Sequence, residues 1–165
     1  MAEDASPFQP LLDEHEEFLE KLNELEAVLD EMTNTREANE GNRELLDEAI
    51  RFFEEELLSH FTREDRIVLP PIEARIGRFG TLVNVVAYEH EEVRREIAKF
   101  KEARAALDDG KDPWPAIQEL NRHGIFTIQF LWDHFRKEKT SLFPTAVKSL
   151  SSEELDGIRT ALGQR

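Results

Sequence analysis

The chain has 165 residues, a length that suits one domain, and 39 % of them are hydrophobic, including 11 Phe, enough for a single sizeable core. Its formal net charge of −15 opposes binding to DNA or to an anionic membrane surface. No apolar run is long enough to span a membrane, and the acidic N-terminus differs from a secretory signal. The chain has no Cys, which excludes disulfides, thiolate nucleophiles and iron–sulfur ligands of its own. We therefore expect a cytoplasmic protein with neither nucleic-acid nor membrane partners.

Apolar residues recur at intervals of three and four along most of the chain, while Gly and Pro cluster between these stretches. This distribution is typical of an all-α protein, and no stretch alternates at period two for long enough to predict a strand. The four expected helices are, in chain order, Phe8 to about Met32, about Asn42 to Leu69, Thr81 to about Leu107, and Pro115 to about Leu150. Their lengths and short connections predict an antiparallel up-down-up-down four-helix bundle.

Several local signals set the expected helix ends. Pro70 and Pro71 should end the second helix, with a short helical piece following as IEARIG, and the fourth helix should bend near Pro144. Thr81 is expected to cap the third helix, and SSEEL from Ser151 predicts a capping box. We expect one domain over residues 1–165, with residues 1–7 disordered and a short C-terminal helix within 151–165.

Two stretches of the chain are nearly copies of each other. HFTREDRIVLP begins at His60 and HFRKEKTSLFP at His134, and each places a Glu four residues after its His, at Glu64 and Glu138. A second phrase, EHEE, also occurs twice, around His15 and around His90. Two separate motifs are thus both present in duplicate.

The four histidines of these phrases should lie at one level of the bundle. In an antiparallel hairpin, two residues lie at the same height when both are equally far from the turn. The midpoints fall near residues 37 and 38 for His15 and His60, at 75 for His60 and His90, and at 112 for His90 and His134. All three midpoints lie in expected loops, so we predict one histidine per helix at a common height.

Glu64 and Glu138 should share the helix faces of their histidines, because residues four apart are neighbours on a helix. Four imidazoles and two carboxylates buried together would be costly without a partner, and both are ligands of non-haem iron and related ions. Six such groups exceed the needs of one tetrahedral zinc. Two ions, each held by two histidines and sharing both glutamates, would use every group and leave coordination positions open.

The order of these motifs resembles that of the hemerythrin-like, or HHE cation-binding, family over roughly residues 8–150. The resemblance implies a non-haem di-iron centre, oxo- or hydroxo-bridged, with Glu64 and Glu138 as the bridging carboxylates. Manganese and zinc are the alternative metals. The implied ligands are His15, His60, Glu64, His90, His134 and Glu138.

One position departs from the oxygen-carrying members of that family. These carry a second His four residues after the first on the third helix, where this chain has Arg94. The six-ligand pattern is more similar to the di-iron domain of repair-of-iron-centre proteins and related bacterial stress proteins, which commonly have an additional Cys-containing N-terminal segment. The small molecules expected to bind at the open coordination positions are oxygen, nitric oxide or peroxide. Reversible binding or sensing, a peroxide-degrading or nitric-oxide-reducing enzyme, and an iron-handling or repair protein remain as alternatives.

Other residues near the motifs are expected to have lesser roles. His123 lies eleven residues before His134, about 16 Å along the helix axis, and is expected to be packed rather than a ligand of the same centre. Asp65 is turned about 100° from Glu64, so Glu64 is preferred as the ligand. Glu16 and Glu91 follow ligand histidines and are expected to be solvated, with a support role for a histidine as the alternative.

The aromatic residues beside the motifs fall into two pairs. Phe61 and Phe135 directly follow His60 and His134 and should form a dry wall around the metals. Tyr88 and Trp132 each lie two residues before a ligand histidine, on the opposite side of the helix. We expect this second pair to pack rather than to relay electrons.

Overall fold

The computed structural model describes residues 6–163, and these form helices and no strand, which confirms the all-α prediction. The N-terminal residues predicted to be disordered lie mostly outside this range. The helical elements are α1 (Gln9–Thr35), α2 (Glu40–Arg51), the π-helical segment η1 (Phe52–Leu57), α3 (Leu58–Arg63), the π-helical segment η2 (Glu64–Val68), α4 (Leu69–Ile76), α5 (Leu82–Ala106), α6 (Trp114–Lys137), the π-helical segment η3 (Glu138–Leu142), α7 (Phe143–Ser149) and α8 (Ser152–Gly163).

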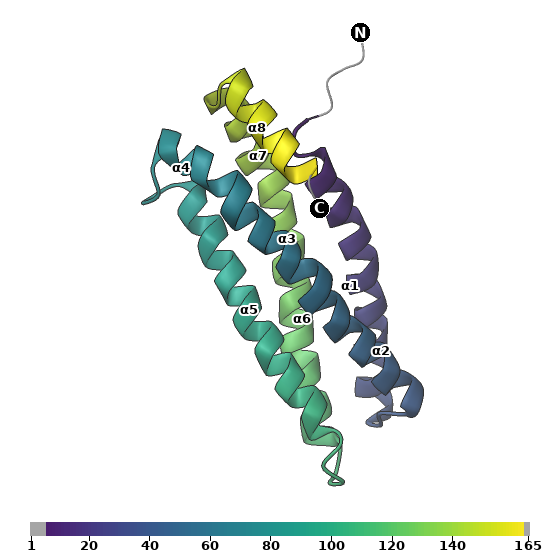
Figure 1. The fold of residues 1–165 in the computed structure, drawn as a ribbon. Helices are drawn as coiled ribbons and strands as arrows, with labels where there is room; N and C mark the ends of the chain where they lie inside the picture. Colours follow the sequence, from purple (N-terminus) through teal and green to yellow (C-terminus); the bar gives the residue numbers. More distant parts are fainter. Residues whose placement is uncertain (1–5, 164–165) are drawn as a thin grey trace.

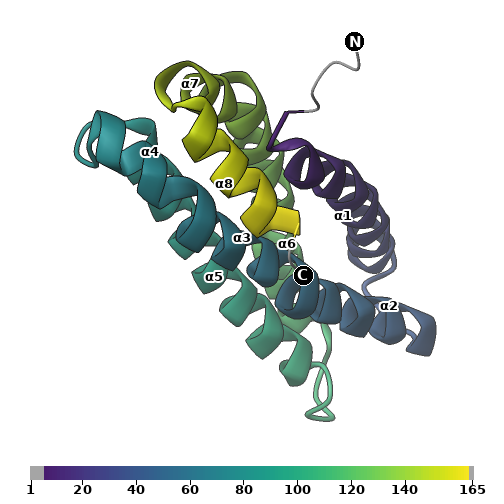
Figure 2. The same ribbon diagram turned by 45° about the horizontal axis from the view of Figure 1, so that its top comes forward.

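Within residues 6–163, the elements from α1 to α7 form four long helical rods. α1 and α5 are one rod each, the elements from α2 to α4 follow one another without a break, and so do those from α6 to α7. In Figure 1 the α1–α2 and α5–α6 loops lie at the lower end and the α4–α5 connection lies at the upper end. α8 folds back over the upper end, as the tilted view of Figure 2 also shows, and it contacts η2.

Local sequence explains most of the helix ends. Asn39 caps α2 in a capping box, since Asn39 accepts from the Asn42 N–H and Asn42 accepts from the Asn39 N–H. The predicted box before α8 is confirmed, with Ser151 and Glu154 bonded reciprocally. The expectation for Thr81 is wrong in part, because α5 begins after it but its hydroxyl donates to preceding carbonyls instead of capping.

The predicted end of the second helix at Pro70 is wrong, because the rod continues through both prolines to Ile76. The π-helical segment η2 immediately precedes them, and its wider turn brings the N–H of Leu69 to the carbonyl of Glu64, five residues back. The fourth rod repeats this arrangement with η3 before Pro144. Single π turns within α-helices are frequent at functional sites, and here one of them begins at each of the two motif glutamates.

The apolar core is divided into two clusters by the motif residues. The larger cluster includes Leu29, Phe53 and Phe100 and lies toward the α1–α2 loop, whereas the smaller one includes Phe8 and Ile72 and is covered by α8. In α1 and α5 the motif histidines fall between the members of these two clusters, and in the other two rods Glu64 and Glu138 do, whereas His60 and His134 directly precede Phe61 and Phe135 of the larger cluster. The bundle therefore carries one buried polar layer between two dry layers.

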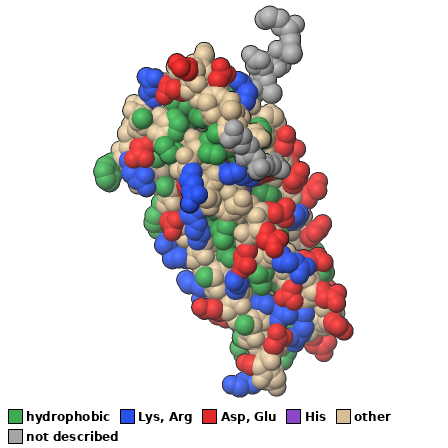
Figure 3. All heavy atoms as spheres, viewed as in Figure 1, with side chains coloured by type: hydrophobic (Ala, Val, Ile, Leu, Met, Phe, Trp, Pro, Cys, Tyr) green, Lys and Arg blue, Asp and Glu red, His purple; other side chains and the backbone are tan. Residues whose placement is uncertain are grey.

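The surface is strongly charged. Acidic side chains gather along the edge of the molecule formed by α1 and α2 in Figure 3. Among residues 6–163, no helix is long and apolar enough to cross a membrane.

Candidate metal centre

The structure brings all six predicted ligand side chains together in the buried polar layer. His15 comes from α1 and His60 from α3, with Glu64 at the first residue of η2. The other half consists of His90 from α5, His134 from α6 and Glu138 at the start of η3. His15 is 4 % exposed, and the other five residues are at most 1 % exposed.

These side chains form two overlapping groups of four. One group contains His15, His60 and both glutamates, and the other contains His90, His134 and the same two glutamates. Within each group, every residue offers one ligand atom within 4.8 Å of the others. Both glutamates are therefore placed to serve two ions at once.

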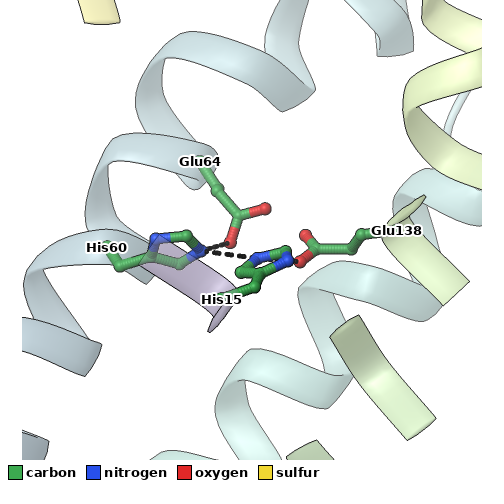
Figure 4. Close-up of side chains that lie close together, drawn as sticks. All are labelled: His15, His60, Glu64 and Glu138. Carbon is green, nitrogen blue, oxygen red and sulfur yellow. Dashed lines mark hydrogen bonds and ion pairs between the residues drawn. The ribbon is translucent and has the colours of Figure 1, made fainter. Parts of the chain in front are cut away.

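The first group shows how closely the donors approach one another. His15 Nε2 lies 3.1 Å from His60 Nε2 and 3.2 Å from Glu138 Oε1. His60 Nε2 lies 2.9 Å from Glu64 Oε1 (Figure 4). The second group is similar, with His134 Nε2 lying 3.3 Å from Glu138 Oε1.

Two of the histidines are oriented by a glutamate that directly precedes another motif histidine. His60 Nδ1 donates to Glu14 at 2.8 Å, and His134 Nδ1 donates to Glu89 at 2.9 Å. Each nitrogen must carry the proton, because a carboxylate only accepts, and this leaves Nε2 free to bind a metal. Each glutamate is in turn bonded by a cation, Glu14 by Arg63 and Glu89 by Lys137.

A third histidine has a similar support of different origin. His90 Nδ1 donates to Asp65 Oδ1 at 2.7 Å, and Arg94 donates to Asp65 Oδ2 at 2.9 Å. Asp65 is thus turned away from the centre but holds one of its histidines. Arg94, which stands where oxygen carriers have a histidine, stabilises this carboxylate and not the centre itself.

The electrostatics of the centre favour positive charge. Burial opposes protonation of His60, but Glu64 and Glu14 raise its pKa to about 9. Burial likewise opposes protonation of His134, and Glu138 and Glu89 raise its pKa to about 10. Burial would raise the pKa of Glu64, but His60 and its other partners hold it well below the usual range. Without a metal, protons on His60 and His134 supply cationic charge beside the carboxylates.

The pattern of hydrogen bonding tests whether a metal fits. Within residues 6–163, six buried nitrogen and oxygen atoms of the predicted metal ligands have no hydrogen-bond partner, although several lie within 3.6 Å of another ligand atom. Leaving such groups unsatisfied in a dry interior is costly, and imidazole nitrogen with carboxylate oxygen is a donor set for divalent transition metals. The residues therefore fit a metal. The atoms are Nε2 of His90 and His134 and both carboxylate oxygens of Glu64 and Glu138.

The aromatic neighbours follow the predictions in part. Phe61 stacks on His90 and Phe135 on His15, each with ring centroids 4.1 Å apart, which confirms the dry wall. The packing predicted for Tyr88 and Trp132 is wrong, because these side chains are 61 % and 48 % exposed. An apolar side chain on the outer face of a bundle helix has no second layer to pack against.

His123 lies away from the centre. It is buried in the larger apolar layer, with Nδ1 2.6 Å from Glu96 and Nε2 3.1 Å from Glu119. The two carboxylates approach opposite ring nitrogens, so they cannot share an ion with this histidine. The expectation of a packed histidine is confirmed.

Glu14 and Glu89 are the functional candidates that the sequence reasoning missed. Glu16 and Glu91, which follow the histidines, are both exposed, which confirms that they are solvated. A signal was present, since Glu14 and Glu89 each directly precede a motif histidine. Their midpoints with His60 and His134 also fall in the same loops as those of the histidine pairs.

A family model described as the hemerythrin HHE cation-binding domain matches residues 6–146. The chain belongs to this family. The curated relatives include an iron–sulfur cluster repair protein, DnrN, from Neisseria gonorrhoeae, which is 30 % identical over 99 residues. The matched region covers 58 % of this chain and 61 % of that relative. This hemerythrin-like chain thus spans about three fifths of the relative's length, and the similarity to a repair protein agrees with the resemblance drawn from the ligand pattern.

Proposed function

We propose that this hemerythrin-like chain is a non-haem di-iron protein that binds or reacts with oxygen, nitric oxide or peroxide. The observation that carries the proposal is the pair of overlapping groups of four side chains, in which six buried atoms of Glu64, Glu138, His90 and His134 lack hydrogen-bond partners. The proposed ligands are His15, His60, Glu64, His90, His134 and Glu138, held by an antiparallel up-down-up-down bundle. Iron bound there would supply redox chemistry and an exchangeable coordination position.

The protein's own residues prepare this site in three ways. Glu14, Asp65 and Glu89 fix the ring orientation of three histidines and keep their Nε2 atoms directed inward. Phe61 stacks on His90 and Phe135 stacks on His15, so each ring shields one face of an imidazole from water. The two glutamates supply negative charge that both donor groups share.

The proposal is tested by metal content and by reactivity. Protein purified with its native metal should carry close to two iron ions per chain. Reduced protein mixed anaerobically with oxygen, peroxide and nitric oxide in turn should give a stable spectral change for a binding module, or repeated consumption of one reactant for an enzyme. Iron content far below two per chain after anaerobic reconstitution with ferrous iron would contradict the proposal.

A second candidate function is iron handling or repair, which the similarity to DnrN favours. A donor of iron must release it to an acceptor under mild conditions, whereas a gas-binding protein retains it. Incubation of the loaded protein with an apo iron–sulfur protein, followed by separation and metal analysis of both, distinguishes the two. Transfer of iron would favour repair.

A further inference from the structure

The donor groups are related by an internal two-fold pattern. His60 and His134 correspond, because each donates Nδ1 to a glutamate that directly precedes another motif histidine, Glu14 for His60 and Glu89 for His134. His15 and His90 also correspond, because the Nε2 of each lies near one motif glutamate, at 3.2 Å from Glu138 for His15 and 3.6 Å from Glu64 for His90.

The aromatic contacts follow the same pattern. Phe135 stacks on His15 and Phe61 stacks on His90, with the same centroid separation of 4.1 Å and the same interplanar angle of 16°. The two halves are therefore nearly equivalent in these hydrogen bonds to glutamate and in the stacking of phenylalanine on histidine.

The pattern breaks first at the residue that follows each motif glutamate. Asp65, the residue after Glu64, accepts a hydrogen bond from His90 Nδ1, whereas the residue after Glu138 is Lys139. An ammonium group has no acceptor, so Lys139 cannot do for His15 what Asp65 does for His90. Among residues 6–163, His15 Nδ1 has no hydrogen-bond acceptor; both polar contacts of this side chain involve Nε2.

The cation that supports Asp65 is also missing from the other half. Arg94 lies four residues after His90, and the corresponding residue after His15 is Leu19. His15 thus lacks both parts of the carboxylate–cation pair that orients its counterpart.

A surface cavity opens on the same side. The α1–α6 cavity has a volume of about 670 Å³ and lies between α1 and the rod of α6 and η3. Of the six proposed ligands, only His15 lines it, and Leu19 and Lys139 also lie on its wall. The histidine without an acceptor therefore has open space beside it.

We propose that the two metal positions are unequal and that the position held by His15 and His60 exchanges its ion through the α1–α6 cavity. His15 acts as the ligand that dissociates, because its ring is held on one face by Phe135 but has no acceptor at Nδ1. The position held by His90 and His134 retains its ion, because hydrogen bonds to Asp65 and Glu89 resist rotation of both rings. This inference rests on the proposed dinuclear centre and would also provide the release step that an iron donor needs.

The test is the rate of metal release. The protein is loaded anaerobically with ferrous iron, its iron content is measured, and a strong ferrous chelator is added in excess. We expect two phases of equal amplitude, with the faster one roughly 10- to 100-fold faster than the slower, the range typical for the loss of a supporting hydrogen bond to a metal ligand.

Two sets of variants assign the phases. Lys139→Asp, alone or with Leu19→Arg, supplies the missing acceptor and should slow the fast phase about tenfold or more, toward the rate of the slow phase. Asp65→Asn removes the existing acceptor and should accelerate the slow phase. Lys148→Asp, the same charge change at an exposed site on α7, should alter neither phase.

The outcomes separate this inference from the proposed function. Binding of only one ion would overturn the dinuclear proposal and the inference with it. Two ions that leave at a single rate would overturn the inference alone, and so would a fast phase that Lys139→Asp leaves unchanged. Lys139 is exposed, so its replacement should leave the fold intact. The effect of Lys139→Asp therefore decides whether the fast phase belongs to the position of His15 and His60, even if Asp65→Asn does not fold.

Discussion

The two halves of the buried polar layer have the same donors but different surroundings. On the side of His90, a carboxylate accepts a hydrogen bond from the imidazole and an arginine donates to that carboxylate. On the side of His15, a leucine and a lysine stand at the corresponding positions, and both line a surface cavity together with His15. Duplicated ligand motifs therefore give two similar donor groups, and the residues one step outside them decide how firmly each histidine is held.

The largest expected effect tests whether the glutamates serve both halves. Glu64→Ala and Glu138→Ala should each abolish binding of both ions, because each carboxylate belongs to both donor groups. His15→Ala and His90→Ala should each remove one ion, because each histidine belongs to only one group. Metal analysis of anaerobically reconstituted protein measures this. The control variant Glu16→Ala removes an exposed carboxylate next to His15 and should still bind two ions. If Glu64→Ala or Glu138→Ala also binds two ions, the two groups do not share these glutamates.

The second largest effect tests the hydrogen bonds that the two halves have in common, those from His60 to Glu14 and from His134 to Glu89. Glu14→Gln and Glu89→Gln should each lower the affinity of the adjoining position by roughly 10- to 100-fold, because a neutral amide orients the imidazole less firmly. The two losses should be similar. Competition with a chelator of known affinity measures both, and a loss confined to one variant would show that the halves already differ at this level.

A pH effect should be common to both halves of the metal-free protein. The pKa of His60 is raised from 6.5 to about 9 and that of His134 to about 10, so their protonation stabilises the fold fully below about 6.5 and this contribution is lost as the pH rises through 9 and 10. Thermal unfolding of metal-free protein should therefore occur at lower temperature above pH 9. Metal-loaded protein should lose less over the same range, since bound metal has already displaced these protons. Parallel losses with and without metal would contradict this account.

The smallest effect on the centre is expected from His123→Gln. The variant should bind two ions like the unchanged protein, since His123 contacts Glu96 and Glu119 and none of the six proposed ligands. It should lower the free energy of unfolding by about 1–3 kcal/mol, the usual cost of losing a buried hydrogen bond to a charged group. Denaturant unfolding and metal analysis of the same sample measure both quantities, and loss of an ion would place this histidine in the centre after all.

Much of the fold could be predicted because helical periodicity is a local property. The spacing of Leu22, Leu25 and Leu29 is enough to predict the buried face of α1, and the SSEEL phrase is enough to predict the start of α8. The continuation of the second rod through Pro70 could not be predicted in this way. Proline normally ends a helix, whereas here a π turn that contacts α8 precedes Pro70 and the rod continues.

The meeting of the six donor side chains was also predictable, because equal distances from three loops place four histidines at one height. Their binding of two ions stays a prediction. The acceptors behind the histidines were not recognised, since Glu14 and Asp65 look like ordinary surface carboxylates along their own helices. Only the neighbouring helix turns each of them into the partner of an imidazole.

The sequence by itself determined which residue types recur and at what spacing, and hence an all-α chain with a duplicated histidine and glutamate motif. Tertiary structure decided which carboxylate faces which ring nitrogen and where open space remains. The physical reason is that periodicity within a helix depends on backbone geometry alone, whereas a hydrogen bond between helices depends on their rotation and separation. The difference between Asp65 and Lys139 is one letter in the sequence, and it acquires its meaning from the histidine across the helix interface.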